Sequence, residues 1–204
     1  ERNKEAAHTE FRYNVKCRNT GRICLFTNTG QLHTIKVADI PFGRFRDKGQ
    51  PVDNISNYSS STEQIVNIAS QSELNLYRLL FVTRQGMCKI VSGGEFDVTK
   101  RTVAATKLGE DDELLDIEVV TEHQHMILQS KNGYFLRFDT DEISELKKTA
   151  VGVRGMRLGA DDFIEKVYYC QPDSDGTILY KDKNVPINKL KVNKRDTKGT
   201  KIRV

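Results

Sequence analysis

The chain has 204 residues, of which 37% are hydrophobic and 29% are charged, and its formal net charge is +4. This length allows one large β domain or two small ones with a buried core. No apolar run approaches the ~18 residues of a membrane-spanning helix, and no signal-peptide pattern is present, so we expect neither membrane insertion nor secretion. The net charge alone does not indicate nucleic acid, because 28 acidic residues offset 32 basic ones.

In chain order, the hydrophobic pattern is that of strands joined by tight turns. Residues 1–10 are polar and predict a leader or a cut edge outside the folded domain. Residues 23–27 form an apolar run that ends in a glycine turn, and residues 32–37 then alternate, which predicts a β-hairpin. The pattern recurs three times. The predicted turn residues are Gly30, Gly86, Gly133 and Asn184.

Further extended runs lie between the hairpins, at residues 65–69, 114–120 and 164–170. The predicted turn residues are 56, 47 and 51 positions apart. Repeats of roughly 40–50 residues, each made of several strands, are typical of propeller-like arrays. We therefore predict a single all-β domain over residues 11–204, with about four repeat units. Their boundaries are 11–60, 61–109, 110–160 and 161–204.

Basic residues recur at similar places in these units, in the loop after each hairpin and in the segment that closes each unit. We interpret that segment as a strand in which Lys107, Arg157 and Arg203 point to the same side. A curved belt of cations could neutralise several phosphates of a DNA duplex without reading its sequence. Solvated surface charge is the alternative for any one of them. The candidate DNA-binding residues are Arg44, Arg46, Lys48, Lys100, Arg101, Lys107, Lys147, Lys148, Arg154, Arg157, Arg195, Lys198 and Arg203.

Candidates for catalysis or metal binding are weak. His123 and His125 would share one face of a strand, but no cysteine or carboxylate follows at ligand spacing. The acidic residues at 111–113 and 161–162 recur at equivalent turns, so we interpret them as solvated loop acids. The four cysteines, at 17, 24, 88 and 170, form no CxxC pair and are expected to be reduced thiols. We predict no catalytic residue, no metal and no cofactor in this chain.

Several phrases resemble the C-terminal domain of the A subunit of bacterial type IIA topoisomerases, DNA gyrase or topoisomerase IV. They are residues 26–30 (FTNTG), 35–41 (IKVADIP), 44–49 and, most specifically, 152–158 (GVRGMRL). The resemblance extends from about residue 11 to the end. It implies a β-pinwheel, a disc of four-stranded blades that exchange strands, which binds and bends DNA around a basic rim. Two features depart from the family. The chain has no Gln-Arg-Arg-Gly-x-x-Gly box, and it has four units where five or six are usual.

The resemblance implies a non-catalytic module of a larger, ATP-dependent topoisomerase. The A subunit of that parent enzyme would form a dimer and pair with an ATPase B subunit, with ATP and Mg²⁺ bound on other domains or subunits. The catalytic tyrosine would lie outside this chain. The expected partner is double-stranded DNA, and the expected location is the bacterial cytoplasm, at the nucleoid. The main alternative is a propeller that serves as a protein-interaction scaffold. A propeller enzyme lacks any converging set of acid, base or metal ligands.

Overall fold

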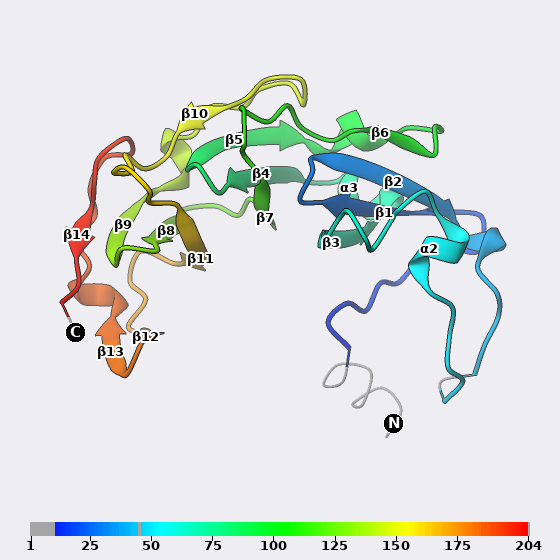
Figure 1. Cartoon of the computed structure of the whole chain (residues 1–204), viewed down its shortest axis with the longest axis horizontal. Helices are drawn as coiled ribbons and strands as arrows, with labels where there is room; N and C mark the ends of the chain where they lie inside the picture. The colour runs from blue at the N-terminus through cyan, green and yellow to red at the C-terminus, as the bar shows by residue number, and fades with distance from the viewer. Residues whose placement is uncertain (1–10, 45, 204) are drawn as a thin grey trace.

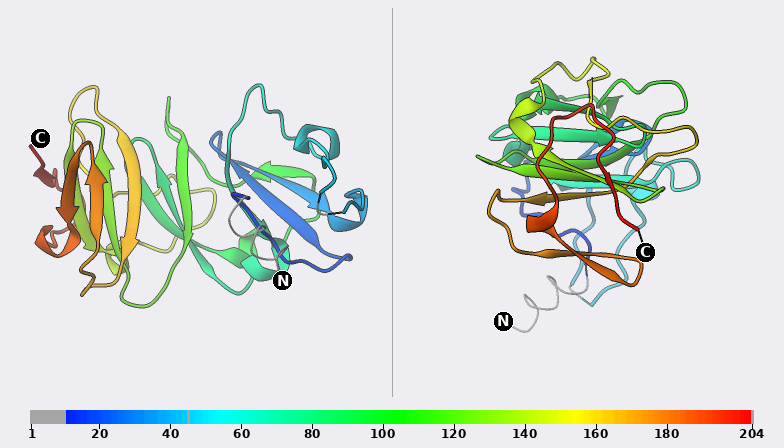
Figure 2. Two further views of the ribbon diagram at one scale, coloured as in Figure 1. Left: turned by 90° about the horizontal axis from the view of Figure 1, so that it is seen from below. Right: turned by 90° about the vertical axis from the view of Figure 1, so that its left-hand side faces the viewer.

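The computed structural model of the chain describes residues 11–44 and 46–203. The predicted leader, residues 1–10, lies outside the described residues. The strands form four antiparallel sheets arranged along an open arc (Figure 1). Seen from below, the sheets stand side by side along the long axis of the molecule (Figure 2). We call these sheets blades 1 to 4, in chain order of their central hairpins.

Each blade is built around one hairpin. Blade 1 contains β1 (Arg22–Thr27) and β2 (Gln31–Lys36), flanked by β3 (Ile65–Ser70) and β6 (Thr102–Ala104). Blade 2 contains β4 (Arg78–Thr83) and β5 (Met87–Ser92), flanked by β7 (Leu114–Val119) and β10 (Val153–Arg154). Blade 3 contains β8 (His125–Ser130) and β9 (Tyr134–Asp139), flanked by β11 (Ile164–Cys170) and β14 (Thr200–Lys201). Blade 4 has only β12 (Thr177–Tyr180) and β13 (Lys183–Pro186).

The helices are short. The α-helices α2 (Val52–Ile55) and α3 (Gln71–Leu74) have one turn each. The 3₁₀ turns η1 (Val37–Asp39), η2 (Gly93–Phe96), η3 (Thr140–Glu142) and η4 (Ile187–Lys189) each follow a hairpin. None of the helices in the described part of the chain is long and apolar enough to cross a membrane.

The blades exchange strands along the chain, so that each sheet draws on several sequence units. In blades 1 to 3, the first strand of the hairpin pairs with a strand that follows that hairpin in the chain, as β1 does with β3. The second strand pairs with one further on, as β2 does with β6. This exchange confirms the all-β, pinwheel-like fold. In Figure 1 the later strands β6, β10 and β14 form the outer edge of the arc, and β3, β7 and β11 line its inner side.

The fourth blade differs from the expected four-stranded blade, and the arc is open where we expected a disc. Within the described residues, no strand pairs with the free edges of β12 and β13. The predicted turn at Asn184 is also wrong. Asn184 lies within β13, and the turn is formed by Lys181 and Asp182, where Lys181 has φ of 51°.

Glycine turns shape the other hairpins as predicted. Gly86 and Gly133 have φ of 78° and 80°, values that side chains with a Cβ adopt at a cost. The carbonyl of Gly86 then accepts a hydrogen bond from the amide of Gly155, at 2.8 Å. The carbonyl of Gly133 similarly accepts one from the amide of Ile202, at 2.9 Å. Each turn therefore also anchors the segment that follows the outer strand of its own blade.

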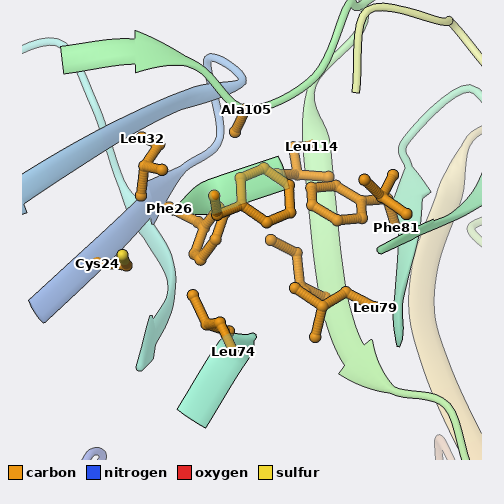
Figure 3. Packing of buried hydrophobic residues seen from close by; sticks show 11 residues of the cluster. Cys24, Phe26, Leu32, Leu74, Leu79, Phe81, Ala105 and Leu114 are labelled. Atoms are coloured by element: carbon orange, nitrogen blue, oxygen red, sulfur yellow. The ribbon is translucent and has the colours of Figure 1, made fainter. Parts of the chain in front are cut away.

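The hydrophobic core lies between the blades. Alternate residues of β4 point to opposite faces, so that Leu79 and Phe81 pack between blades 1 and 2 while Leu80 and Val82 pack between blades 2 and 3. Figure 3 shows the first of these clusters, in which Phe26 lies edge-on to Phe81 with ring centroids 6.1 Å apart. Burial on both faces explains why these strands are continuously apolar instead of alternating.

Candidate nucleic-acid interface

The outer edge of the arc is a continuous path of backbone from one blade to the next. After β6, the amide of Lys107 donates to the carbonyl of Lys148, at 3.2 Å. After β10, the amide of Arg157 donates to the carbonyl of Thr197, at 2.9 Å. These bonds bring the predicted cations Lys107 and Lys148 together, and they bring Arg157 next to the loop that carries Arg195 and Lys198.

A glutamate fixes the basic pair Lys147–Lys148. Glu95, in η2, accepts a hydrogen bond from the amide of Lys148 at 2.9 Å, and its backbone carbonyl accepts one from the Lys148 ammonium at 2.9 Å. The ammonium of Lys147 lies 3.5 Å from the Glu95 carboxylate, but the Lys147 side chain remains 83% exposed. The loop is therefore held in one shape while one of its two cations still faces solvent.

The same set of contacts recurs in blade 3. Glu142, in η3, accepts a hydrogen bond from the amide of Arg195 at 3.2 Å, and its carbonyl accepts one from Arg195 Nε at 3.0 Å. Lys194 lies 3.8 Å from the Glu142 carboxylate and is 85% exposed. Lys194, which was not among the predicted site residues, thus corresponds to Lys147, and Arg195 to Lys148. We call these two arrangements the Glu95 clamp and the Glu142 clamp.

A buried lysine supports the first of these loops. Lys89, on β5, is 1% exposed, and its ammonium donates to the carbonyls of Lys148 at 2.7 Å and Ala150 at 2.6 Å. It also reaches the carbonyl of Lys147, at 3.4 Å. Burial lowers the pKa of Lys89 to about 8, and Glu95 partly opposes that shift. The sequence indicated only a charged residue in an apolar strand, and its partners are far away in the chain.

Two predicted cations of the third unit share one acid. Arg154 Nη1 lies 3.3 Å and Arg157 Nε 3.7 Å from the same carboxylate oxygen of Asp196. Arg195 Nη1 also donates to the carbonyl of Arg154, at 3.1 Å. The side chains of Arg154 and Arg157 are 55% and 64% exposed, so a ligand on the outer edge could still reach them.

The closing segments differ from the strands that we predicted. The strands end at Ala104, Arg154 and Lys201, so Lys107 and Arg157 lie in the segments after them. The strand register aligns Lys201 with Arg154, and it does not align Arg203 with Arg157. Lys201 pairs with Tyr134 as Arg154 pairs with Met87, directly after the turn glycine in each case. Arg203 therefore corresponds to Met156, one residue before Arg157.

The basic residues of blade 3 gather on an aromatic ring. The ammonium groups of Lys198 and Lys201 lie 4.6 Å and 5.4 Å from the centroid of the Tyr134 ring. Arg203 is exposed, and its carbonyl accepts a hydrogen bond from Lys183 Nζ at 3.0 Å. Lys201 was not among the predicted site residues. Aligning the segments on the turn glycines instead of on the terminal residues would have found it.

Contrary to the prediction from the sequence pattern, Lys100 and Arg101 are not equivalent to Lys147 and Lys148. They continue the antiparallel pairing of β6 along β2, where the Arg101 carbonyl accepts the amide of Thr34 at 2.8 Å. The Thr34 hydroxyl donates to the carbonyl of Lys100, at 2.9 Å. The connection from η2 to β6 is shorter than the one from η3 to β10, so the Lys147–Lys148 type of loop is absent from this unit.

The loop of the first unit lies apart from these residues. Figure 1 shows it at one end of the arc beside α2, projecting away from β6 and β10. Arg44, Arg46 and Lys48 are all exposed, and the amide of Arg44 donates to the Asp47 carboxylate at 2.6 Å. The structure therefore brings together the predicted cations of blades 2 and 3 but leaves this group separate.

The acidic turns are structural, and one of them is buried. Asp112, 8% exposed, accepts hydrogen bonds from the amides of Gln85 at 2.9 Å and Glu113 at 2.8 Å. Asp162 accepts from the amide of Asn132 in the same way, at 3.0 Å. The prediction of a solvated acid is wrong for Asp112, because each carboxylate holds a neighbouring hairpin turn. Among the described residues, no group of three or more His, Cys, Asp or Glu side chains is arranged to hold a metal ion.

The fold and the edge together define the class of protein. The sheets exchange strands around an arc, and cations lie in the loops of its outer edge. This arrangement is typical of a propeller-like domain with a basic rim. The family model described as "DNA gyrase C-terminal domain, beta-propeller" matches residues 77–121 and 124–171. The chain matches this family over those residues, and it is similar to A subunits of DNA gyrase and to the C-terminal domain of DNA topoisomerase IV.

Curated relatives by sequence are A subunits of DNA gyrase. The protein from Lawsonia intracellularis is 31% identical over 155 residues, which is 75% of this chain and 19% of that protein. The protein from Rickettsia bellii is 32% identical over 145 residues, which is 68% of this chain and 16% of that protein. The chain thus spans about one fifth of the length of these relatives.

Solved structures include domains of both enzymes. The crystal structure of the C-terminal domain of DNA topoisomerase IV superimposes with a TM-score of 0.81 at 25% identity, covering 98% of this chain and 67% of that one. The DNA gyrase A C-terminal domain superimposes with a TM-score of 0.67 at 22% identity, covering 91% and 61%. At that identity the second likeness shows the fold alone.

Proposed function

We propose that this chain is a DNA-binding and DNA-bending module of a bacterial type II topoisomerase A subunit. The observation that carries the proposal is the outer edge. The Glu95 and Glu142 clamps hold two basic loops along it, and Lys107, Arg154 and Arg157 lie beside those loops. A ligand with regularly spaced negative charge, such as the phosphate backbone of a duplex, would complement this edge along its length.

The contacts would be to phosphate and would not depend on sequence. The edge consists of loops and short closing segments, and none of the helices among the described residues is long enough to lie across a groove. The curvature of the arc would bend a duplex that followed it. Such a module would hold a DNA segment for strand passage, while the chemistry, ATP and Mg²⁺ belong to other parts of the parent enzyme. The proposal also includes a dimer of A subunits, ATPase B subunits as partners, and the bacterial cytoplasm as the location.

Fluorescence anisotropy with a duplex of about 40 base pairs would test binding. Between roughly 50 and 200 mM salt, we expect affinity to fall about 10³-fold or more, as for six or more phosphate contacts. Two duplexes of unrelated sequence should give the same slope. Ligation of nicked circles in the presence of the chain would then report bending, and the sign of any linking difference would separate chiral wrapping from simple bending. An absence of binding at the lowest salt would contradict the proposal.

The second candidate is a protein-interaction scaffold. Its support is the neutralisation seen within the edge, where Glu95, Glu142 and Asp196 already pair with several of the cations. An acidic protein partner would also be salt-sensitive, but it would not release the condensed counterions of a duplex. A shallow salt dependence with DNA would favour this candidate.

A further inference from the structure

Blade 1 contains a basic pocket at the open end of its hairpin. Its volume is about 230 Å³, and its lining includes Arg22, Thr34, Lys36, Asp39, Thr99 and Arg101. Arg22 and Lys36 face each other as the terminal pair of β1 and β2. Arg101 enters from the segment before β6, which the two hydrogen bonds of Thr34 hold against β2. The cations thus come from three points on one rigid sheet.

The short connection to β6 explains why this space is open. Counted from the turn glycine of its hairpin, Asp39 takes the position of Glu95 in blade 2 and of Glu142 in blade 3. Those two glutamates are clamped onto the basic pair of the following unit. No described residue makes a hydrogen bond or an ion pair with the side chain of Asp39. The place that the clamps fill in blades 2 and 3 is a pocket in blade 1.

The charge of this pocket also differs from that of the equivalent place in blade 2. Arg78 occupies the position of Arg22, and its guanidinium lies 3.7 Å from the Glu145 carboxylate. Within residues 11–44 and 46–203, no carboxylate lies at ion-pair distance from Arg22, Lys36 or Arg101. Three cations therefore surround the pocket against a single acid, Asp39. This excess of positive charge favours the binding of an anion in the pocket.

We propose that this pocket is a phosphate-binding site that takes one phosphodiester of a bound duplex. Guanidinium groups bind phosphate oxygens through paired N–H donors, and Arg22 and Arg101 supply two such groups with Lys36 as a further point charge. The assignment of DNA as the source of the phosphate rests on the proposed function. The expected affinity of the pocket for phosphate itself rests only on the three cations that line it. Neither Arg22 nor Lys36 was among the residues that the sequence pattern suggested.

Inorganic phosphate is the first probe. Titration of the 204-residue chain, followed by backbone amide NMR at constant ionic strength, should shift the amides of Thr34, Lys36 and Arg101 with saturation. The variant Lys36→Gln/Arg101→Gln, whose changes are both at exposed side chains, should lose these shifts and keep the rest of its spectrum. Shifts spread evenly over the basic edge, or unchanged in this variant, would overturn the proposal.

Duplex DNA is the second probe, with a matched control. Arg22→Gln should weaken binding to a duplex of about 40 base pairs about tenfold and lower the salt slope by about 1, as for one lost phosphate contact. Arg78→Gln changes the equivalent but ion-paired residue and should weaken binding less than about twofold. The two variants should have similar Tm values. Because Arg22 is half-buried, the DNA titration is repeated with Lys36→Gln/Arg101→Gln, which changes only exposed side chains.

The outcomes separate this inference from the proposed function. Tight, salt-dependent DNA binding with equal losses for Arg22→Gln and Arg78→Gln would refute the pocket and leave the function standing. Phosphate binding at the pocket without any DNA binding would support the pocket, assign it to a free phosphate and refute the proposed function.

Discussion

The ammonium group of Lys89 lies 2.7 Å from the carbonyl oxygen of Lys148, a residue of the next unit that Glu95 also holds through its amide. A buried cation on the central strand of one blade thus fixes the loop that presents cations at the edge. Blade stability and the shape of the interface are coupled at this contact.

Replacement of this lysine should loosen the loop. Lys89→Met keeps an unbranched side chain of similar length but leaves the carbonyls of Lys148 and Ala150 without their donor. We expect the free energy of unfolding to fall by about 1–3 kcal/mol. Hydrogen exchange should rise around residues 147–150 more than elsewhere. Chemical denaturation and exchange mass spectrometry would measure both, with Lys100→Met, an exposed substitution, as the control that changes neither.

The same residue predicts a pH dependence of stability. Its pKa is about 8 in the folded chain, below the ordinary value of 10.5, because burial disfavours the charged form. Between these two values the unfolded chain binds more protons than the folded chain, so the contribution of Lys89 to stability rises with pH. Below about pH 8 both states are protonated and this dependence disappears. The difference in unfolding free energy between wild type and Lys89→Met should change between about pH 8 and 10 and stay flat from about pH 6 to 7.5. A flat difference throughout would show that the ammonium is not desolvated.

Blade 4 should depend on one arginine. Arg137, on β9, is 3% exposed and donates to the carbonyls of Ile187 at 2.9 Å and Pro172 at 2.6 Å. Its Nε donates a hydrogen bond to Nδ1 of His125. Burial and this guanidinium lower the pKa of His125, which favours the neutral imidazole that can accept this hydrogen bond. Arg137→Met should cost about 2–4 kcal/mol of stability. Exchange protection should be lost first in β12 and β13.

The control for this prediction is Arg154→Met, which removes an exposed arginine of the outer edge. It should leave the protection of β12 and β13 unchanged. If Arg137→Met lowered protection evenly over all blades, the hairpin would not be held by this side chain in particular.

Charge reversal should weaken DNA binding for all sequences alike. Lys147→Glu/Lys194→Glu changes two cations that are 83% and 85% exposed, so it tests the edge without breaking the backbone clamps. Lys148 and Arg195 are less suitable, because their side chains donate to the backbone carbonyls of Glu95 and Glu142, so replacing them would remove part of each clamp. We expect affinity to fall by about tenfold or more on two unrelated duplexes, with a salt slope smaller by about 2.

The matched variant is Lys16→Glu/Lys166→Glu, which makes the same change in net charge at exposed residues elsewhere. Lys166 lies on the inner strand β11, and Lys16 follows Asn14 and Val15, which lie beside β3 and β7. This variant should bind almost as wild type. A loss on only one of the two duplexes would contradict phosphate recognition.

The amino-acid sequence by itself determined the hairpins and the all-β class, because these depend on neighbours in the chain. The glycines at 30, 86 and 133 and the apolar runs before them specify turns and buried strands locally. The motif at residues 152–158 was the most specific part of the family resemblance. The same local reasoning failed at Asn184, since the two-residue turn there is formed by Lys181 and Asp182 without glycine.

Only the tertiary structure decided how the cations are arranged. Strand exchange pairs residues far apart in the chain, so the register that places Lys201 in line with Arg154 depends on contacts with β9 and β5. The Glu95 clamp, the burial of Lys89 and the pocket of blade 1 depend on the length of the connection that follows each hairpin. That length is visible in the sequence, but its consequence is not, because a charged side chain is free or neutralised only through neighbours that the fold supplies.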